Sequence, residues 1–155
     1  MDIFQIQTIF QLVLSIILGG AIGLERETKG KAAGFQTYSL ATLGACIFTL
    51  VSVNLFDLFY AKSGIAFDPS RIVLAVATGI GFIGAGVIFK RDFFQLEGIT
   101  TASGLWCVAA IGVAIGVKLY LIALTSALLV MIVFMIFGKI ENSYLSKLPR
   151  KSKNK

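Results

Sequence analysis

Three glycines with the spacing of a nucleotide-binding loop are the first feature of this chain that could do chemistry. Gly79, Gly81 and Gly84 form the pattern G-x-G-x-x-G, which in a soluble α/β protein places backbone amides against a dinucleotide pyrophosphate. Glu97 follows 18 residues after Gly79, close to where such a site has its ribose-binding acid. The motif works only between a strand and a helix of a βαβ unit, so its meaning depends on the element that carries it.

A cluster of charges follows the first apolar run of the chain. It contains Glu25, Arg26 and Glu27. Acids are unfavourable at the C-terminal end of a helix, so we expect the helix to continue past them and to stop at Gly30 as a C′ residue. Glu25 then stands four residues before Lys29, which is a stabilising spacing. The cluster is either a group of solvated charges or a polar contact with another helix or an ion.

A second group of charges stands at the start of the third apolar run. Asp68 and Pro69 are favoured at the N-cap and first positions of a helix, so capping accounts for both. Arg71 comes next and is a cation near the positive end of the helix dipole. It needs a partner, for which Asp68 is the nearest candidate, and we therefore single out Arg71 as functional or structurally paired.

Enzymatic chemistry has little support in the composition. The chain has no histidine, which removes the commonest general base and transition-metal ligand. Cys46 and Cys107 both lie in apolar runs and are interpreted as small buried residues. Cys107 has no histidine to activate it as a nucleophile. We therefore predict no catalytic residue, no cofactor and no metal site, and an intramembrane enzyme is the least favoured of three functions.

The composition as a whole is that of an integral membrane protein. Hydrophobic residues make up 57% and charged residues 14% of the chain, against about 45–50% and about 25% in soluble domains. A span needs about 20 mostly apolar residues, and the sequence predicts an all-α bundle of five transmembrane helices. The predicted spans are residues 6–24, 38–55, 71–89, 101–116 and 119–137.

The distribution of basic residues predicts the orientation. The first and third connections and the tail hold eleven of the fourteen lysines and arginines, so the N-terminus is expected outside and the C-terminus in the cytoplasm. The predicted domains are a transmembrane unit, residues 1–138, and a basic cytoplasmic tail, residues 139–155. Its last part, KLPRKSKNK, is expected to be disordered at the anionic lipid surface. Topology accounts for the charge without nucleic-acid binding. The start MDIFQIQ has no basic region, so no cleavable signal peptide is expected.

The fourth span is shorter than the bilayer. Sixteen residues rise about 24 Å, so it is either an ordinary short span or one whose entry segment dips into the protein. Thr100 or Thr101 is expected to cap it. Trp106 lies too deep for an interfacial anchor and is expected to pack between helices. The last two spans are joined by little more than Val117 and Lys118, which predicts a tight antiparallel hairpin.

Glycines with helical spacing predict how the helices pack. Small faces let backbones approach closely in lipid, and the third span carries several such residues. We therefore place the third helix centrally, against the first and fourth, with the fifth facing lipid. The G-x-G-x-x-G pattern then belongs to a crowded helix face. The packing glycines are Gly19, Gly23, Gly79, Gly81, Gly84, Gly86, Gly112 and Gly116.

Four stretches of the chain resemble the MgtC/SapB family of membrane proteins. They are GGAIGLERETKGKAAGFQT, DPSRI, TGIGFIGAGVIFK and GITTASGLWCVAAIG, in an order that covers most of residues 10–120. The match is to the membrane domain, closer to the short SapB-like type, without the ACT-like C-terminal domain of MgtC-type proteins. Thr100 stands where MgtC-type proteins have Asn, and Gln36 where much of the family has Arg.

The resemblance implies a multi-pass protein of the bacterial inner membrane linked to growth at low magnesium. An MgtC-type member binds the ATP synthase membrane part, so it implies a regulator that contacts membrane proteins such as ATP synthase or ion transporters. The alternative is an ion transporter or channel component acting as a homo-oligomer. The expected partners are lipid, a second copy in a dimer and a membrane protein. The candidate functional residues are Glu25, Arg26, Glu27, Asp68, Arg71, Thr100, Thr101, Trp106 and Cys107.

Overall fold

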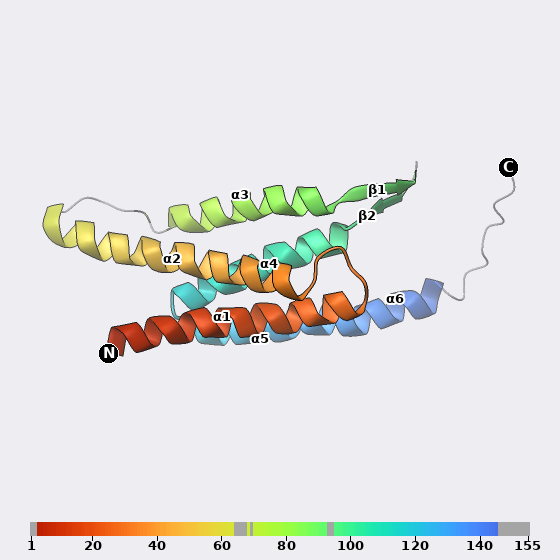
Figure 1. The fold of residues 1–155 in the computed structure, drawn as a ribbon, viewed down its shortest axis with the longest axis horizontal. Coiled ribbons are helices and arrows are strands. Elements are labelled where there is room, and N and C mark those ends of the chain that lie inside the picture. Colours follow the sequence, from red (N-terminus) through yellow and green to blue (C-terminus); the bar gives the residue numbers. More distant parts are fainter. Residues whose placement is uncertain (1–2, 64–67, 69, 93–94, 146–155) are drawn as a thin grey trace, which may run out of the picture.

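The protein is a bundle of long helices with one short hairpin at its edge (Figure 1). The computed structural model describes residues 3–63, 68, 70–92 and 95–145. Five of its helices are long and apolar enough to cross a membrane, which confirms the predicted fold class of five membrane-spanning helices. The elements are α1 (Ile3–Thr28), α2 (Phe35–Ser63), α3 (Ser70–Val87), β1 (Phe89–Asp92), β2 (Gln95–Glu97), α4 (Ile99–Gly116), α5 (Tyr120–Ile132), the π-helix η1 (Val133–Phe137) and α6 (Gly138–Leu145).

The end of α1 follows the prediction from its charges. The helix continues through the acidic cluster to Thr28, and Gly30 has a φ of 61°, which a glycine adopts without strain. The amide of Gly30 donates to the carbonyl of Glu27 at 2.9 Å, and that of Lys31 to the carbonyl of Arg26 at 3.1 Å. These two bonds are those of a Schellman stop, so the predicted C′ role of Gly30 is confirmed.

The turn between α4 and α5 repeats this stop without a glycine. Lys118 has a φ of 65°. Its amide donates to the carbonyl of Ile115 at 3.0 Å, and the amide of Leu119 to that of Ala114 at 2.8 Å. The predicted tight hairpin is thus confirmed.

The entry to α4 corrects one prediction. Neither Thr100 nor Thr101 caps the helix; the N-cap is Gly98, with a φ of 94° and no side-chain cap. An added Cβ on Gly98 would lie 2.3 Å from the carbonyl oxygen of Val87, so the turn requires glycine. Before it, the connection predicted as a loop contains the antiparallel pair β1 and β2, with Phe89 opposite Glu97.

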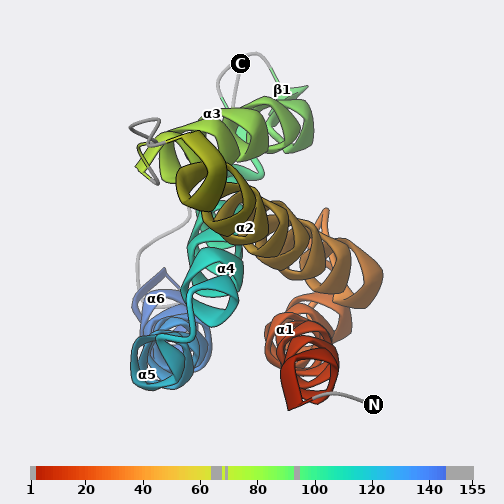
Figure 2. The ribbon, with the colours of Figure 1, turned by 90° about the vertical axis from the view of Figure 1, so that its left-hand side faces the viewer.

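The centre of the bundle is α4, which corrects the placement of the third helix. In α4, 61% of the residues are buried, against 11% in α3. Figure 2 shows α4 between α2, α3 and α5, with α3 at the edge. The main contact of α3 is with α4, where Gly84 meets Ala102. The prediction was wrong because a small-residue face signals close approach without saying whether the neighbour lies in the same chain.

The other glycine faces pack on α2. An added Cβ on Gly19 of α1 would lie 2.3 Å from Oγ1 of Thr42. An added Cβ on Gly112 of α4 would lie 2.2 Å from the carbonyl oxygen of the same Thr42. An added Cβ on Gly116 would also collide with α2, and one on Gly23 would collide with α2 and with the residue directly before it. These four glycines therefore lie close to α2 or to the residue directly before it, and not to α3.

Buried polar side chains in this core bond to helix backbones. The Gln11 amide donates to the carbonyls of Ile115 at 2.6 Å and Gly116 at 3.0 Å, which the last turn of α4 leaves without helical partners. Thr42 and Thr49 each donate to the carbonyl four residues earlier on α2. Because each of these groups is hydrogen-bonded, the polar core is compatible with burial.

The last span is predominantly exposed to the surroundings, as expected for a lipid-facing helix. Within α5 only Ala123 and Ala127 are buried. The helix then widens into η1 and continues as α6, so the chain stays helical to Leu145, beyond the predicted start of the tail at 139. The predicted disorder of the tail falls on residues 147–155, outside the described residues.

Candidate functional site

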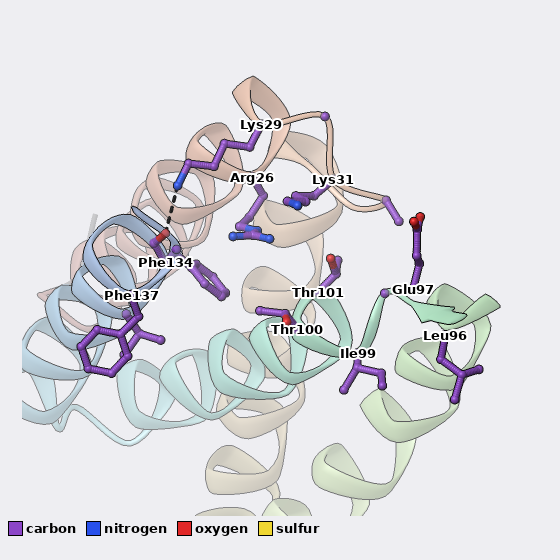
Figure 3. Close-up of a pocket in the computed structure, with 15 residues that line it drawn as sticks. Arg26, Lys29, Lys31, Leu96, Glu97, Ile99, Thr100, Thr101, Phe134 and Phe137 are labelled. Carbon is purple, nitrogen blue, oxygen red and sulfur yellow. Dashed lines mark hydrogen bonds between the residues drawn. The ribbon is translucent and has the colours of Figure 1, made fainter. Parts of the chain in front are cut away.

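A pocket of about 870 Å³ opens at the end of the bundle where α1 stops and α4 begins (Figure 3). Three segments that are distant in sequence form it: the end of α1 with its following loop, the β2–α4 junction, and η1. Among the predicted site residues it brings together Arg26, Thr100 and Thr101. The lining residues are Arg26, Lys29, Gly30, Lys31, Ala32, Leu96, Glu97, Gly98, Ile99, Thr100, Thr101, Val133, Phe134, Phe137 and Gly138.

Arg26 is the most unusual of these residues because it is a buried cation. Only 4% of its surface is exposed. Its guanidinium lies over the ring of Phe134, with 4.2 Å between Cζ and the ring centroid, a cation–π contact. One nitrogen lies 3.5 Å from a carboxylate oxygen of Glu25, and Nε has no hydrogen-bond partner among the described residues. A buried charge with so few partners is costly.

Glu25 and Lys29 hold the end of α1 against η1. Glu25 forms the predicted ion pair with Lys29 one turn later and also faces Arg26, so one carboxylate is shared by two cations. The Lys29 ammonium donates to the carbonyl of Phe134 at 2.9 Å. This carbonyl lies in η1, where the α-helical hydrogen-bond pattern is interrupted. Glu25 itself pairs with two cations of its own helix, and Lys29 makes the polar contact with η1.

The far wall of the pocket is the first turn of α4. Thr101 is buried and Thr100 is exposed. The hydroxyl of Tyr38 on α2 donates to the carbonyl of Thr101 at 3.1 Å, which fixes this turn to the core. The first N–H groups of a helix lack intrahelical partners, and Gly98 provides no side chain to cap them. This wall therefore presents amide donors and the positive end of a helix dipole.

The remaining predicted charges serve the helix ends. Glu27 accepts a hydrogen bond from the amide of Phe35 at 2.7 Å and so joins α1 to the start of α2. Asp68 accepts from the amide of Ser70 at 2.9 Å and from its hydroxyl at 2.7 Å, as an N-cap does. These bonds, and secondarily the charge of Arg71, lower the pKa of Asp68 below its usual value. Asp68 and Arg71 lie at the start of α3, and Figure 1 shows that α3 starts at the end of the bundle opposite β1 and β2.

The aromatic and thiol candidates on α4 do not reach the pocket. Trp106 is 56% exposed, so the expectation that it packs between helices was wrong: its side of α4 faces outward. Cys107 is half-buried and Cys46 fully buried, and both are free thiols. Cys46 donates to the carbonyl of Gln11 at 3.8 Å between sulfur and oxygen, which agrees with a packing role for Cys46.

Sequence reasoning missed Lys31, Phe134 and Glu97 as residues of this site. Lys31 is one of the basic residues whose distribution predicts the membrane orientation, and Phe134 belongs to a span predicted to face lipid. No local pattern marks Phe134, because its contact with Arg26 joins positions 108 residues apart. For Lys29 and Lys31 the signal was their place directly after the acidic cluster.

A second candidate surface lies on α3. Added Cβ atoms on Gly79, Gly81 and Gly86 would meet nothing within 4 Å, and the neighbouring Phe82 is 83% exposed. These glycines, predicted to pack helices, therefore have no described neighbour from another element beside them. Gly79 and Gly86, seven residues apart, lie on one side of the helix, and Gly81 lies on another. We call Gly79 and Gly86 the open face of α3.

The sequence matches the MgtC family over residues 12–143. It is 37% identical to "Putative magnesium transporter YhiD" of Escherichia coli K12, over 90% of this chain and 64% of the relative. It is 36% identical to "Protein SapB" of Bacillus subtilis, over 80% of this chain and 53% of the relative. It is 40% identical to "Protein MgtC" of Brucella abortus, over 68% and 40%. The chain thus spans less than two thirds of the length of these relatives, and no solved structure matches it.

Proposed function

Since this chain belongs to the MgtC family, we propose that it is a regulatory membrane module of magnesium homeostasis that acts by binding another membrane protein. The open face of α3 is the contact surface in this proposal. Its partner is a transmembrane helix of a different protein, of the class of ion transporters or the ATP synthase membrane part. The link to magnesium rests on the name of the Escherichia coli relative, "Putative magnesium transporter YhiD".

The observation that carries the proposal is the mismatch between composition and packing on α3. Small residues on a membrane helix allow another helix to approach closely, and dispersion contacts then drive association. On α1 and α4 the small faces are filled by α2. On α3 the glycines are just as dense, but the described residues leave their surface vacant. Such a face gains contacts when a further helix lies against it.

Site-specific crosslinking in native membranes tests this proposal. A photoreactive residue in place of Phe82, which lies beside the open face and is 83% exposed, is compared with one at Leu121 on α5, which is 76% exposed and serves as the control. We expect a protein adduct from position 82 in cells grown at low magnesium and lipid adducts alone from position 121. The adduct should be lost when Gly79 and Gly86 are replaced by leucine, and the identified partner should form a complex with the purified chain.

Two outcomes of this experiment would contradict the proposal. Lipid adducts alone at position 82 would mean that the open face is a lipid surface. An adduct between two copies of this chain, with no other protein, would mean that the face serves self-association, as in the homo-oligomeric alternative.

The second candidate function is magnesium transport, which the name of the Escherichia coli relative favours. The pocket argues against a resting place for free Mg²⁺ at that end, because Arg26, Lys29 and Lys31 line it and like charges repel. A path for Mg²⁺ would then lie away from this pocket, between copies of the chain. Mg²⁺ flux into proteoliposomes containing the purified chain, abolished by Glu25→Gln, would establish this function in place of the regulator.

A further inference from the structure

The pocket at the end of α1 contains a buried cation whose hydrogen-bonding capacity is only partly used. A guanidinium carries five N–H donors. In Arg26 one nitrogen lies at 3.5 Å from Glu25, and the Nε–H has no partner in the described part of the chain. The side chain is 95% buried, so bulk water cannot readily replace the missing partners. A native protein seldom leaves such a donor unsatisfied, which indicates that a ligand completes it.

The donors of Arg26 face a second group of donors across the pocket. Figure 3 shows its side chain directed from α1 toward the first turn of α4, where Thr100 and Thr101 stand. That turn has an uncapped amide end, and helix N-termini bind anions through their free N–H groups and dipole. The helix end alone would not define a site, but here it converges with a buried cation.

The charges around the pocket also favour an anion. Lys29 and Lys31 line it together with Arg26, against one lining carboxylate, Glu97. Glu97 takes part in an interaction of its own, and Figure 3 shows its side chain directed away from Arg26. Glu25 pairs with both Arg26 and Lys29 and is not among the residues that line the pocket. Even when both carboxylates are counted, three cations exceed two anions.

We propose that this pocket binds a phosphate group, held by Arg26, Lys31 and the first turn of α4. Tetrahedral phosphate oxygens accept paired bonds from a guanidinium and single bonds from helix amides. Phe134 and Val133 add an apolar wall, so the group belongs either to a phospholipid headgroup or to a small soluble phosphate compound. This site is independent of the partner contact proposed for α3.

Binding measurements on the purified full chain test the proposal and separate the two sources. In a neutral maltoside detergent the chain is titrated with inorganic phosphate in one arm. In the other arm it is mixed with phosphatidylglycerol, or with diacylglycerol, which lacks phosphate, and the retained lipid is counted by native mass spectrometry. We expect one phosphate group per chain in at least one arm, no retention of diacylglycerol, and weaker binding as salt concentration rises.

Three variants locate the site. Arg26→Gln should weaken binding about tenfold or more, the loss that one charge-assisted hydrogen bond represents. Lys31→Gln should weaken binding by a smaller factor. Because Lys31 is exposed, this variant should fold, and it still tests the site if Arg26→Gln fails to fold. Lys118→Gln, at the opposite end of α4, removes an exposed lysine and should leave the affinity unchanged.

The outcomes distinguish the sources and can overturn the site. Binding in the phosphate arm alone assigns a soluble ligand, binding in the lipid arm alone assigns a headgroup, and either supports the site if the Arg26 or Lys31 variant weakens it. The proposal is overturned if the wild-type chain retains neither, or if folded Arg26→Gln and Lys31→Gln bind as tightly as Lys118→Gln. None of these results depends on the crosslinking at α3.

Discussion

Two glycine faces of this protein have similar sequences and opposite surroundings. On α1 and α4, an added Cβ at Gly19 or Gly112 would collide with α2. On α3, the same addition at Gly79 or Gly86 would meet no described atom of another element within 4 Å. The first face holds the bundle together, and the second is available for contact with another molecule. A small-residue face in a membrane helix therefore shows that close approach is permitted and leaves the identity of the neighbour open.

The largest effect is expected from adding a methyl group to the filled face. In Gly112→Ala the new Cβ would lie 2.2 Å from the carbonyl oxygen of Thr42 and 3.1 Å from its carbonyl carbon. Because the obstacle is backbone, α2 and α4 must separate, and we expect a loss of about 3 kcal/mol or more in unfolding free energy. Reversible unfolding in mixed micelles measures it. A wild-type stability for this variant would show that the helices are less tightly packed than the structure has them.

The opposite sign is expected on the open face. Gly79→Ala adds a methyl group to vacant space and replaces the poorest ordinary helix former by the best, so the isolated chain should gain about 1 kcal/mol. The same unfolding assay measures it, with Gly112→Ala as the matched change at a filled position. Destabilisation of the isolated monomer by Gly79→Ala would remove the distinction between the two faces.

An intermediate position sharpens the comparison. In Gly20→Ala the new Cβ would approach the ring edge of Phe35 at 2.9 Å and the hydroxyl of Ser39 at 3.0 Å. Both are ends of side chains that can turn away, and Phe35 is exposed. The strain should nearly cancel the gain in helix propensity, leaving a net change below about 1 kcal/mol. A loss as large as that of Gly112→Ala would show that side-chain obstacles are as rigid as backbone ones.

The smallest effect concerns the cap of α3. Hydrogen bonds from Ser70 lower the pKa of Asp68, so its capping contribution is complete above the ordinary Asp pKa, about 3.9, and is lost as the pH falls through the lower folded-state value. NMR titration of the Ser70 amide in micelles follows this loss. We expect a midpoint below 3.9, and no transition in Asp68→Asn. A midpoint at the ordinary value would mean that the cap does not form in the micelle.

Predictability from sequence differed between the elements and the site. The stop at Gly30 and the Glu25–Lys29 pair were predictable because each is set within a few residues along one helix. The central place given to α3 and the buried position given to Trp106 were wrong, since both depend on which helix lies on which side. The pocket was only partly foreseen: Arg26, Thr100 and Thr101 were candidates, but nothing local joins Arg26 to Phe134.

The sequence by itself determined that this protein is a five-helix membrane bundle, where its spans begin to within three residues, and which faces can approach closely. The length of an apolar run, capping residues and glycine spacing are each set within one helix, so they can be recognised from the sequence alone. Only the tertiary structure decided that α4 is the centre, that α2 fills the glycine faces of α1 and α4, and that Arg26 is buried beside the uncapped start of α4. These facts depend on pairings between distant helices, which many arrangements of the same faces would satisfy equally well.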